Sequence, residues 1–145
     1  MKTQDQGPKV GVLIVTHYRL GEEFLQALRL ILPEAPVWGT VSVDPTMAVE
    51  TVRGSIAAGL KAADSGEGVL ILTDMFGGTP SNMSLSFHDE THVEVVTGVN
   101  LPMLVKLATL GEPRELEDLA AYIREYGQRN ISVASELMPD KKSDA

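Results

Sequence analysis

The 145-residue chain is long enough for one domain with a substantial core, and its composition, 43% hydrophobic and 22% charged, is typical of a globular protein. A formal net charge of −8 argues against nucleic acid or an anionic membrane surface as the main partner. The absence of cysteine excludes disulfides and zinc–thiolate sites, and no apolar run approaches the roughly 20 residues of a membrane span.

Two polar ends flank a continuous domain. Residues 1–9 lack the apolar centre of a signal peptide, and we expect them to form a flexible N-terminus. Residues 136–145 are charged and poor in apolar side chains, so we expect a C-terminal tail. We therefore predict a single domain over residues 10–135, with a cytoplasmic location as the default.

Strand and helix patterns alternate along this domain. Short apolar runs predict strands at residues 10–15, 37–43, 69–72 and 93–96. Apolar residues at helical spacing, together with capping and proline signals, predict helices at residues 20–32, 44–63, 80–87, 101–109 and 116–127. A short amphipathic run predicts one more strand at residues 131–134.

Single residues mark several helix ends and faces. Asn100 is expected to cap its helix, and Thr79 with Pro80 is expected to supply the N-cap and first position of another. In the first helix, Leu28 and Ile31 fall on the apolar face together with Phe24. This alternation predicts a doubly wound α/β fold, with a mainly parallel sheet, helices on both faces and the last strand at an edge. An edge strand at a chain end can pair with another subunit.

Residues 68–82 combine features of an anion-binding turn. Asp74 comes directly after a buried strand, and Gly77-Gly78 lets the backbone turn where a side chain would obstruct it. Thr79 then adds a hydroxyl at the start of a helix, where free backbone N–H groups gather. One acid, one hydroxyl and several N–H donors at a strand-to-helix turn suit the binding of a phosphate group.

His17 directly follows the first predicted strand. A lone histidine is usually a surface or capping residue, but ligands of doubly wound sheets bind beyond the carboxyl ends of the strands. If the first and third strands are neighbours, Asp74 can meet His17 and fix its tautomer, leaving the other ring nitrogen as a nucleophile. We expect the other two histidines, His88 and His92, to be solvated loop residues.

Several other kinds of site fit the sequence less well. An aspartyl-phosphate receiver needs an acidic pair after its first strand, where this chain has Thr16-His17. A Walker motif and a Gly-x-Ser-x-Gly elbow are both absent. A metal site of His17, Asp74 and Glu22 or Glu23 stays open, although no His-x-x-x-His spacing supports it. A histidine oriented by an aspartate beside an anion-binding turn fits transient phosphorylation of that histidine.

Three motifs connect the chain to a known family: Val-Thr-His at 15–17, Leu-Thr-Asp-Met-Phe-Gly-Gly-Thr-Pro-Ser-Asn at 72–82 and Thr-Gly-Val-Asn-Leu-Pro-Met at 97–103. With them, residues 10–135 resemble the enzyme IIA domain of the mannose family in the bacterial phosphoenolpyruvate-dependent sugar phosphotransferase system. The resemblance implies that His17 is phosphorylated, that Asp74 orients it, and that Thr79 with the backbone of Gly77 and Gly78 holds the phosphoryl oxygens.

The same resemblance implies partners. Family members take phosphate from the carrier HPr and pass it to an IIB component, need no metal or organic cofactor, and meet the membrane only through permease subunits. They are typically homodimers that exchange the C-terminal strand. Because residues 136–145 are too few for an IIB domain, we expect the acceptor to be a separate protein.

One departure and two functional alternatives accompany the resemblance. The family commonly has glycine after the histidine, where this chain has Tyr18. We expect Tyr18, Met75 and Phe76 to contact protein partners, since apolar residues at a site rim suit docking.

Two alternatives to sugar transport stay open. One is a regulatory protein whose partner binding depends on His17 phosphorylation, and the other is a phosphocarrier for dihydroxyacetone kinase. The motifs at residues 77–82 and 98–102 fit the sugar-transport members of the fold family better than the phosphocarriers of dihydroxyacetone kinase.

Overall fold

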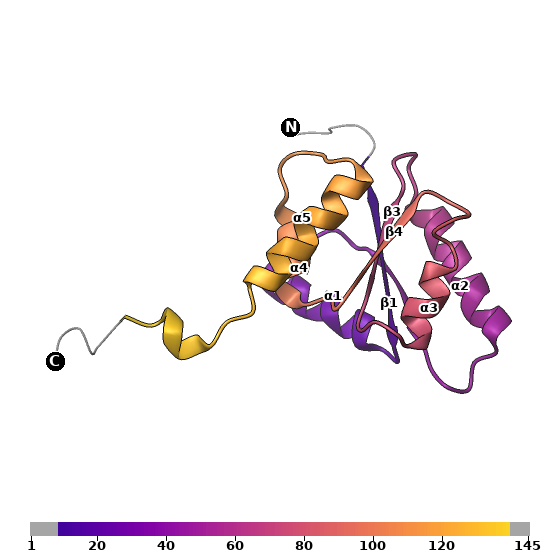
Figure 1. Cartoon of the computed structure of the whole chain (residues 1–145), viewed down its shortest axis with the longest axis horizontal. Coiled ribbons are helices and arrows are strands. Elements are labelled where there is room, and N and C mark those ends of the chain that lie inside the picture. The colour runs from indigo at the N-terminus through magenta and orange to yellow at the C-terminus, as the bar shows by residue number, and fades with distance from the viewer. Residues whose placement is uncertain (1–8, 140–145) are drawn as a thin grey trace.

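The computed structural model describes residues 9–139, which form a four-stranded sheet covered by helices (Figure 1). The strands are β1 (Gly11–His17), β2 (Gly39–Val43), β3 (Val69–Thr73) and β4 (Val93–Thr97). The helices are α1 (Leu20–Ile31), α2 (Val49–Ala63), α3 (Thr79–Leu85), α4 (Leu101–Thr109) and α5 (Leu116–Arg129), followed by the 3-10 turn η1 (Ala134–Leu137). The predicted tail ends, residues 1–8 and 140–145, lie outside the described residues.

All strand pairs are parallel, and the strand order is β2-β1-β3-β4. The chain therefore runs from β1 outward to β2, returns to the other side of β1 and continues outward from β3. β1 and β3 lie side by side with Val15 opposite Thr73, so the residues after these strands emerge at the same edge. The predicted parallel α/β sheet is confirmed, and its switch point lies between β1 and β3.

Side chains that alternate along the strands build one core on each face of the sheet. Ile14, Leu70 and Leu72 pack with residues of α1, α4 and α5 on one face. Leu13 and Ile71 pack with residues of α2 on the other. Every residue of β3 is buried, which explains why its sequence is apolar without alternation. Burying one such Leu or Ile side chain contributes roughly 1.5–3 kcal/mol to folding stability. The position of β3 is therefore well fixed, and with it the position of the residues that follow.

The helices depart from the predictions in three details, two of them helix starts and one an apolar face. The helix predicted from residue 44 begins at Val49, because Asp44 accepts the N–H of Thr46 at 2.8 Å and closes a local turn first. Thr79 is the first helical residue of α3, and Gly78 is its N-cap. Ile31 is 51% exposed because the buried face of α1 follows Leu25 and Leu28, and Ile31 lies outside it. The predicted Asn100 cap is confirmed, since its side chain accepts the N–H of Met103 at 3.1 Å.

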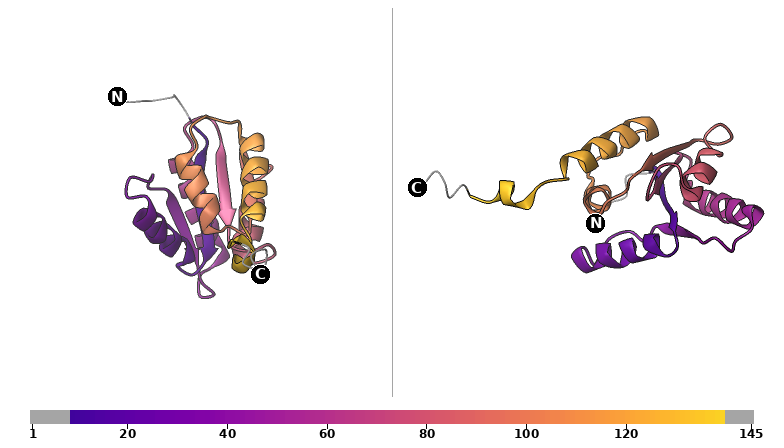
Figure 2. Two further views of the ribbon diagram at one scale, coloured as in Figure 1. Left: turned by 90° about the vertical axis from the view of Figure 1, so that its left-hand side faces the viewer. Right: turned by 60° about the horizontal axis from the view of Figure 1, so that its bottom comes forward.

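The strand predicted at residues 131–134 is not formed in the single chain, so this prediction is wrong for the isolated molecule. After α5 the chain leaves the body of the domain as an arm (yellow in Figures 1 and 2), and residues 131–133 pair with no strand among residues 9–139. A strand exists only as part of a hydrogen-bonded ladder, and this arm lies beyond the reach of either sheet edge. Among the described residues, no helix has the length and apolarity needed to cross a membrane.

Candidate active site

His17 and Asp74 meet at the switch point of the sheet. His17 is the last residue of β1, and Asp74 follows the last residue of β3. The backbone N–H of His17 donates to Oδ2 of Asp74 at 2.9 Å, and the Nδ1 atom of its ring lies 2.9 Å from the same oxygen. One carboxylate oxygen therefore fixes both the backbone and the ring of His17.

The surroundings of Asp74 favour its ionised form. Partial burial raises the pKa of the carboxyl, but the backbone N–H and the ring of His17 lower it by more, so the pKa lies below its ordinary value. The N–H of Met75 adds a hydrogen bond to Oδ1 at 3.0 Å. An ionised carboxylate accepts hydrogen bonds only, so the proton sits on Nδ1 of His17 and the lone pair of Nε2 is left free.

The glycine turn lies directly against the imidazole ring. A Cβ on Gly78 would lie 2.7 Å from Cε1 and 3.0 Å from Nε2 of His17, so only glycine permits this approach. Gly77 has φ +93°, a conformation that glycine adopts without strain. The Cε1–Nε2 edge of the His17 ring therefore faces the turn that begins α3.

Thr79 and His17 line one pocket of about 350 Å³ at this edge of the sheet. Its remaining walls are mostly apolar. They comprise Tyr18 after β1, Asp44 in the β2–α2 loop, Met83 of α3, and the apolar residues Val43, Pro45, Met47, Val49 and Val52. The sequence prediction missed this pocket, because it placed residues 44–48 in a helix. The signal was present in Asp44-Pro45-Thr46, which is also a common loop sequence.

The predicted docking residues surround the site and are exposed. The exposed fractions are 61% for Tyr18, 57% for Met75 and 71% for Phe76. Tyr18 has φ +48°, in the left-handed region where glycine has no steric cost, and its N–H donates to the carbonyl of Val43 at 2.7 Å. Tyr18 thus keeps a backbone shape suited to glycine while placing a phenol ring beside His17.

The other two histidines and Glu22 do not join the site. His88 lies 3.5 Å from both Asp89 and Glu94 on the surface, and His92 lies 3.6 Å from Glu117. The carboxylates of Glu94 and Asp89 accept hydrogen bonds from the His88 ring and raise the pKa of His88. Glu22 accepts the Ser42 hydroxyl at 3.3 Å and pairs with Arg19. Within residues 9–139, no group of three or more His, Asp or Glu side chains is arranged to hold a metal ion.

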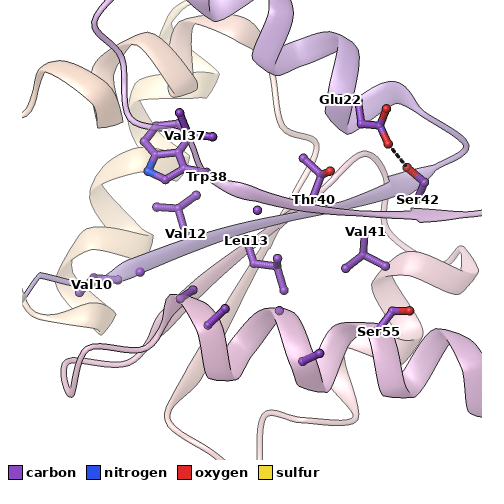
Figure 3. A pocket seen from close by; sticks show the side chains of 16 residues that line it. Val10, Val12, Leu13, Glu22, Val37, Trp38, Thr40, Val41, Ser42 and Ser55 are labelled. Atoms are coloured by element: carbon purple, nitrogen blue, oxygen red, sulfur yellow. Dashed lines mark hydrogen bonds between the residues drawn. The ribbon is translucent and has the colours of Figure 1, made fainter.

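A larger pocket, of about 900 Å³, lies away from His17 along the edge strand β2 (Figure 3). Val37, Trp38 and Thr40 line it on the strand side, and small residues of α2 line it on the other. Among the described residues that line it, Glu22 is the only charged one, and its carboxylate already accepts a hydrogen bond from Ser42. Without a histidine or a base free of partners, it does not offer the chemistry found at His17.

Comparison with known proteins identifies the family of this chain. A sequence model of the EIIA-man family, described as "PTS system fructose IIA component", matches residues 11–124. The chain belongs to this enzyme IIA family. The family resemblance drawn from the sequence motifs is thereby confirmed.

Individual relatives of this enzyme IIA chain carry several sugar names. The "PTS system mannose-specific EIIAB component" of Escherichia coli (strain K12) is 30% identical over 138 residues, 94% of this chain and 43% of the relative. The "PTS system fructose-specific EIIA component" of Bacillus subtilis (strain 168) is 32% identical over 96 residues, 66% of each protein. The chain thus spans less than half the length of the Escherichia coli relative.

A solved structure shows the same fold. The mannose/sorbose specific IIA subunit from Enterococcus faecalis superposes with a TM-score of 0.79 at 28% identity, over 86% of this chain and 94% of that one. The IIA protein associated with a fucose utilization operon in Streptococcus pneumoniae, at 24% identity and a TM-score of 0.73, has the same fold.

Proposed function

We propose that the chain is a phosphohistidine carrier of the sugar phosphotransferase system, with His17 as the phosphorylated residue. The lone pair of Nε2 attacks the phosphorus of phospho-HPr, the N–P bond of the donor breaks, and an N–P bond forms on His17. The single observation behind this proposal is the Asp74 contact with Nδ1, which leaves Nε2 as the free nucleophile. In the transfer to an IIB component, the N–P bond on His17 breaks and a new bond to phosphorus forms on the acceptor.

The phosphoryl group would lie between His17 and the start of α3. The hydroxyl of Thr79 and the backbone N–H groups of Gly77 and Gly78 are the proposed donors to its oxygens. Thr79 lines the pocket beside His17, and the missing side chain at Gly78 leaves the backbone close to Nε2. Transfer between two imidazoles depends on positioning and charge stabilisation, so the proposal includes no metal or organic cofactor.

Donor and acceptor would dock on the same rim. Tyr18, Met75 and Phe76 are the proposed contact residues, and their exposed apolar surface beside a reactive group favours this role. HPr is the proposed donor and a separate IIB protein the proposed acceptor. The cycle would take place in the cytoplasm and meet the membrane only through permease subunits.

The C-terminal arm supports a homodimer in which the two copies exchange this segment. Ile131, Val133, Leu137 and Met138 are between 56% and 75% exposed, which is costly for an isolated chain. Strand 131–134 would then pair with the sheet of the second copy. Truncation after Asn130 should convert a dimer into a monomer in sedimentation experiments. An unchanged mass would rule out exchange through this arm.

Incubation with phosphoenolpyruvate, enzyme I and HPr tests the carrier function. The chain should take up phosphate only when all three are present, and an added IIB protein should remove it. Uptake that needs HPr but is never passed to an IIB acceptor would instead favour the regulatory alternative.

A further inference from the structure

The turn between β1 and α1 is held by a buried hydroxyl that the phosphotransfer chemistry does not use. Thr16 is fully buried, one residue before His17. Its Oγ1 accepts the backbone N–H of Gly21 at 2.8 Å and donates to the carbonyl of Tyr18 at 3.3 Å. One side chain thus connects the end of β1 to both the turn and the first helical turn.

This contact replaces a missing helix cap. The N-cap residue of α1, Arg19, makes no capping hydrogen bond with its side chain, although the first N–H groups of a helix need acceptors. Thr16 supplies that acceptor from the preceding strand. The approach is tight, since a Cβ on Gly21 would lie 3.2 Å from Cγ2 of Ile14 and 3.3 Å from Oγ1 of Thr16 and would press on both.

The same contact holds Tyr18 in its left-handed conformation. Both peptide groups of Tyr18 are hydrogen-bonded. Its N–H donates to the carbonyl of Val43 at 2.7 Å, and its carbonyl accepts from the Thr16 hydroxyl. A tyrosine at φ +48° is stable only where such contacts outweigh the steric cost. Because Tyr18 directly follows His17, the direction of the chain leaving His17 depends on this hydroxyl.

We propose that Thr16 is a positioning residue for phosphotransfer: its buried hydroxyl fixes the turn at residues 17–21 so that the ring of His17 stays on Asp74 with Nε2 facing the glycine turn. The kinetic test of this inference rests on the proposed phosphocarrier function. It also has a structural readout that does not depend on phosphotransfer.

The matched pair of variants is Thr16→Val and Thr73→Val. Both threonines are fully buried at the ends of neighbouring strands, but the Thr73 hydroxyl has no hydrogen-bond partner among residues 9–139. Thr16→Val should lower kcat for transfer from phospho-HPr at least about tenfold, toward the roughly hundredfold loss that a 1 Å misplacement can cause. KM should change little, because the docking rim is untouched. Thr73→Val should retain wild-type kcat, and Thr16→Ser should restore most of it.

The structural readout is the proton on Nδ1 of His17 and the amide of Gly21, both followed by NMR. In the wild-type protein the Gly21 amide should exchange slowly. In Thr16→Val the Nδ1 proton signal should broaden or disappear, while Thr73→Val should retain it. An unprotected Gly21 amide in the wild type, or unchanged kcat and Nδ1 signal in Thr16→Val, would overturn the inference. Wild-type protein that takes no phosphate on His17 would instead overturn the proposed function, and the NMR result would still decide the role of Thr16.

Discussion

Oδ2 of Asp74 lies 2.9 Å from the backbone nitrogen of His17 and 2.9 Å from Nδ1 of the same residue. A single carboxylate oxygen therefore sets the position of the backbone and the orientation of the imidazole together. This geometry directs Nε2 toward Gly78 and Thr79. In the proposed carrier function this contact makes Asp74 more than a cap for the turn after β3, because the carboxylate holds Nδ1 and leaves Nε2 to react.

Asp74→Asn should slow phosphate transfer while leaving the fold intact. Loss of a hydrogen bond to a charged group costs about 1.5–3 kcal/mol, which corresponds to a rate loss of roughly tenfold or more. Single-turnover transfer from phospho-HPr measures this effect. Asp89→Asn is the matched control, because Asp89 is fully exposed at the surface and should leave the rate unchanged. Equal rates for wild type and Asp74→Asn would reduce Asp74 to a structural role.

The pKa of Asp74 also predicts a pH dependence of stability. Because the pKa is lowered in the folded protein, the carboxylate contributes stability above its ordinary pKa of 3.8, and this contribution is lost as the pH falls through the folded-state value. The difference in unfolding free energy between wild type and Asp74→Asn should be constant near neutral pH and should shrink below pH 3.8. Denaturant titrations across this range measure this difference, and a difference that does not change with pH would contradict an ionised Asp74 carboxylate in the folded protein.

Much of this site follows from the sequence by elementary rules. Parallel strands end at one edge, so two strands ending in His17 and Asp74 predict their contact once the strands are neighbours. The contact itself also depends on the strand order, which one sequence does not specify. The turn glycines and the Asn100 cap were predictable because each has a local conformational reason.

Sequence reasoning missed contacts that helix and strand patterns alone do not show. The hydroxyl of Thr16 caps a helix from outside that helix, and no local pattern shows this. The apolar wall of the His17 pocket comes from a loop that was predicted as helix. The segment at 131–134 has the alternation of a strand, but its own chain supplies no partner for it.

Gly78→Ala should impair the site through the ring of His17. The added Cβ would lie 2.7 Å from Cε1, so the imidazole or the turn must move. We expect transfer to fall by at least about tenfold, as a displacement of a few tenths of an ångström to 1 Å would cause. Gly54→Ala is the control: nothing lies within 4 Å of a Cβ there, and alanine in the middle of α2 should stabilise the protein by about 0.5–1 kcal/mol without changing transfer.

Thr79→Val should weaken the phosphorylated form rather than the fold. Loss of one hydrogen bond to the phosphoryl group should shift the transfer equilibrium with HPr by about 1.5–3 kcal/mol. Thr109→Val, at an exposed hydroxyl that donates to the carbonyl of Val105 at 2.9 Å, should leave this equilibrium unchanged. If both variants retain the wild-type equilibrium and phosphoenzyme half-life, Thr79 does not contact the phosphate.

Met75→Ala with Phe76→Ala should raise KM for phospho-HPr and leave kcat nearly unchanged. These side chains are 57% and 71% exposed beside the reacting atoms, so they offer apolar surface to a partner without touching His17 chemistry. Leu30→Ala, at an 85% exposed position near the far end of α1, is the control and should leave KM unchanged. An increase in KM for Leu30→Ala alone would place the docking surface elsewhere.

Mapping of the phosphorylated residue tests the central claim most directly. The chain is incubated with phosphoenolpyruvate, enzyme I and HPr, and the modified residue is identified under alkaline conditions that preserve phosphohistidine. Stoichiometric phosphate on His17, with His17→Ala unlabelled and His88→Gln fully labelled, is the predicted result. Phosphate on His88 or His92, or full labelling of His17→Ala, would contradict it.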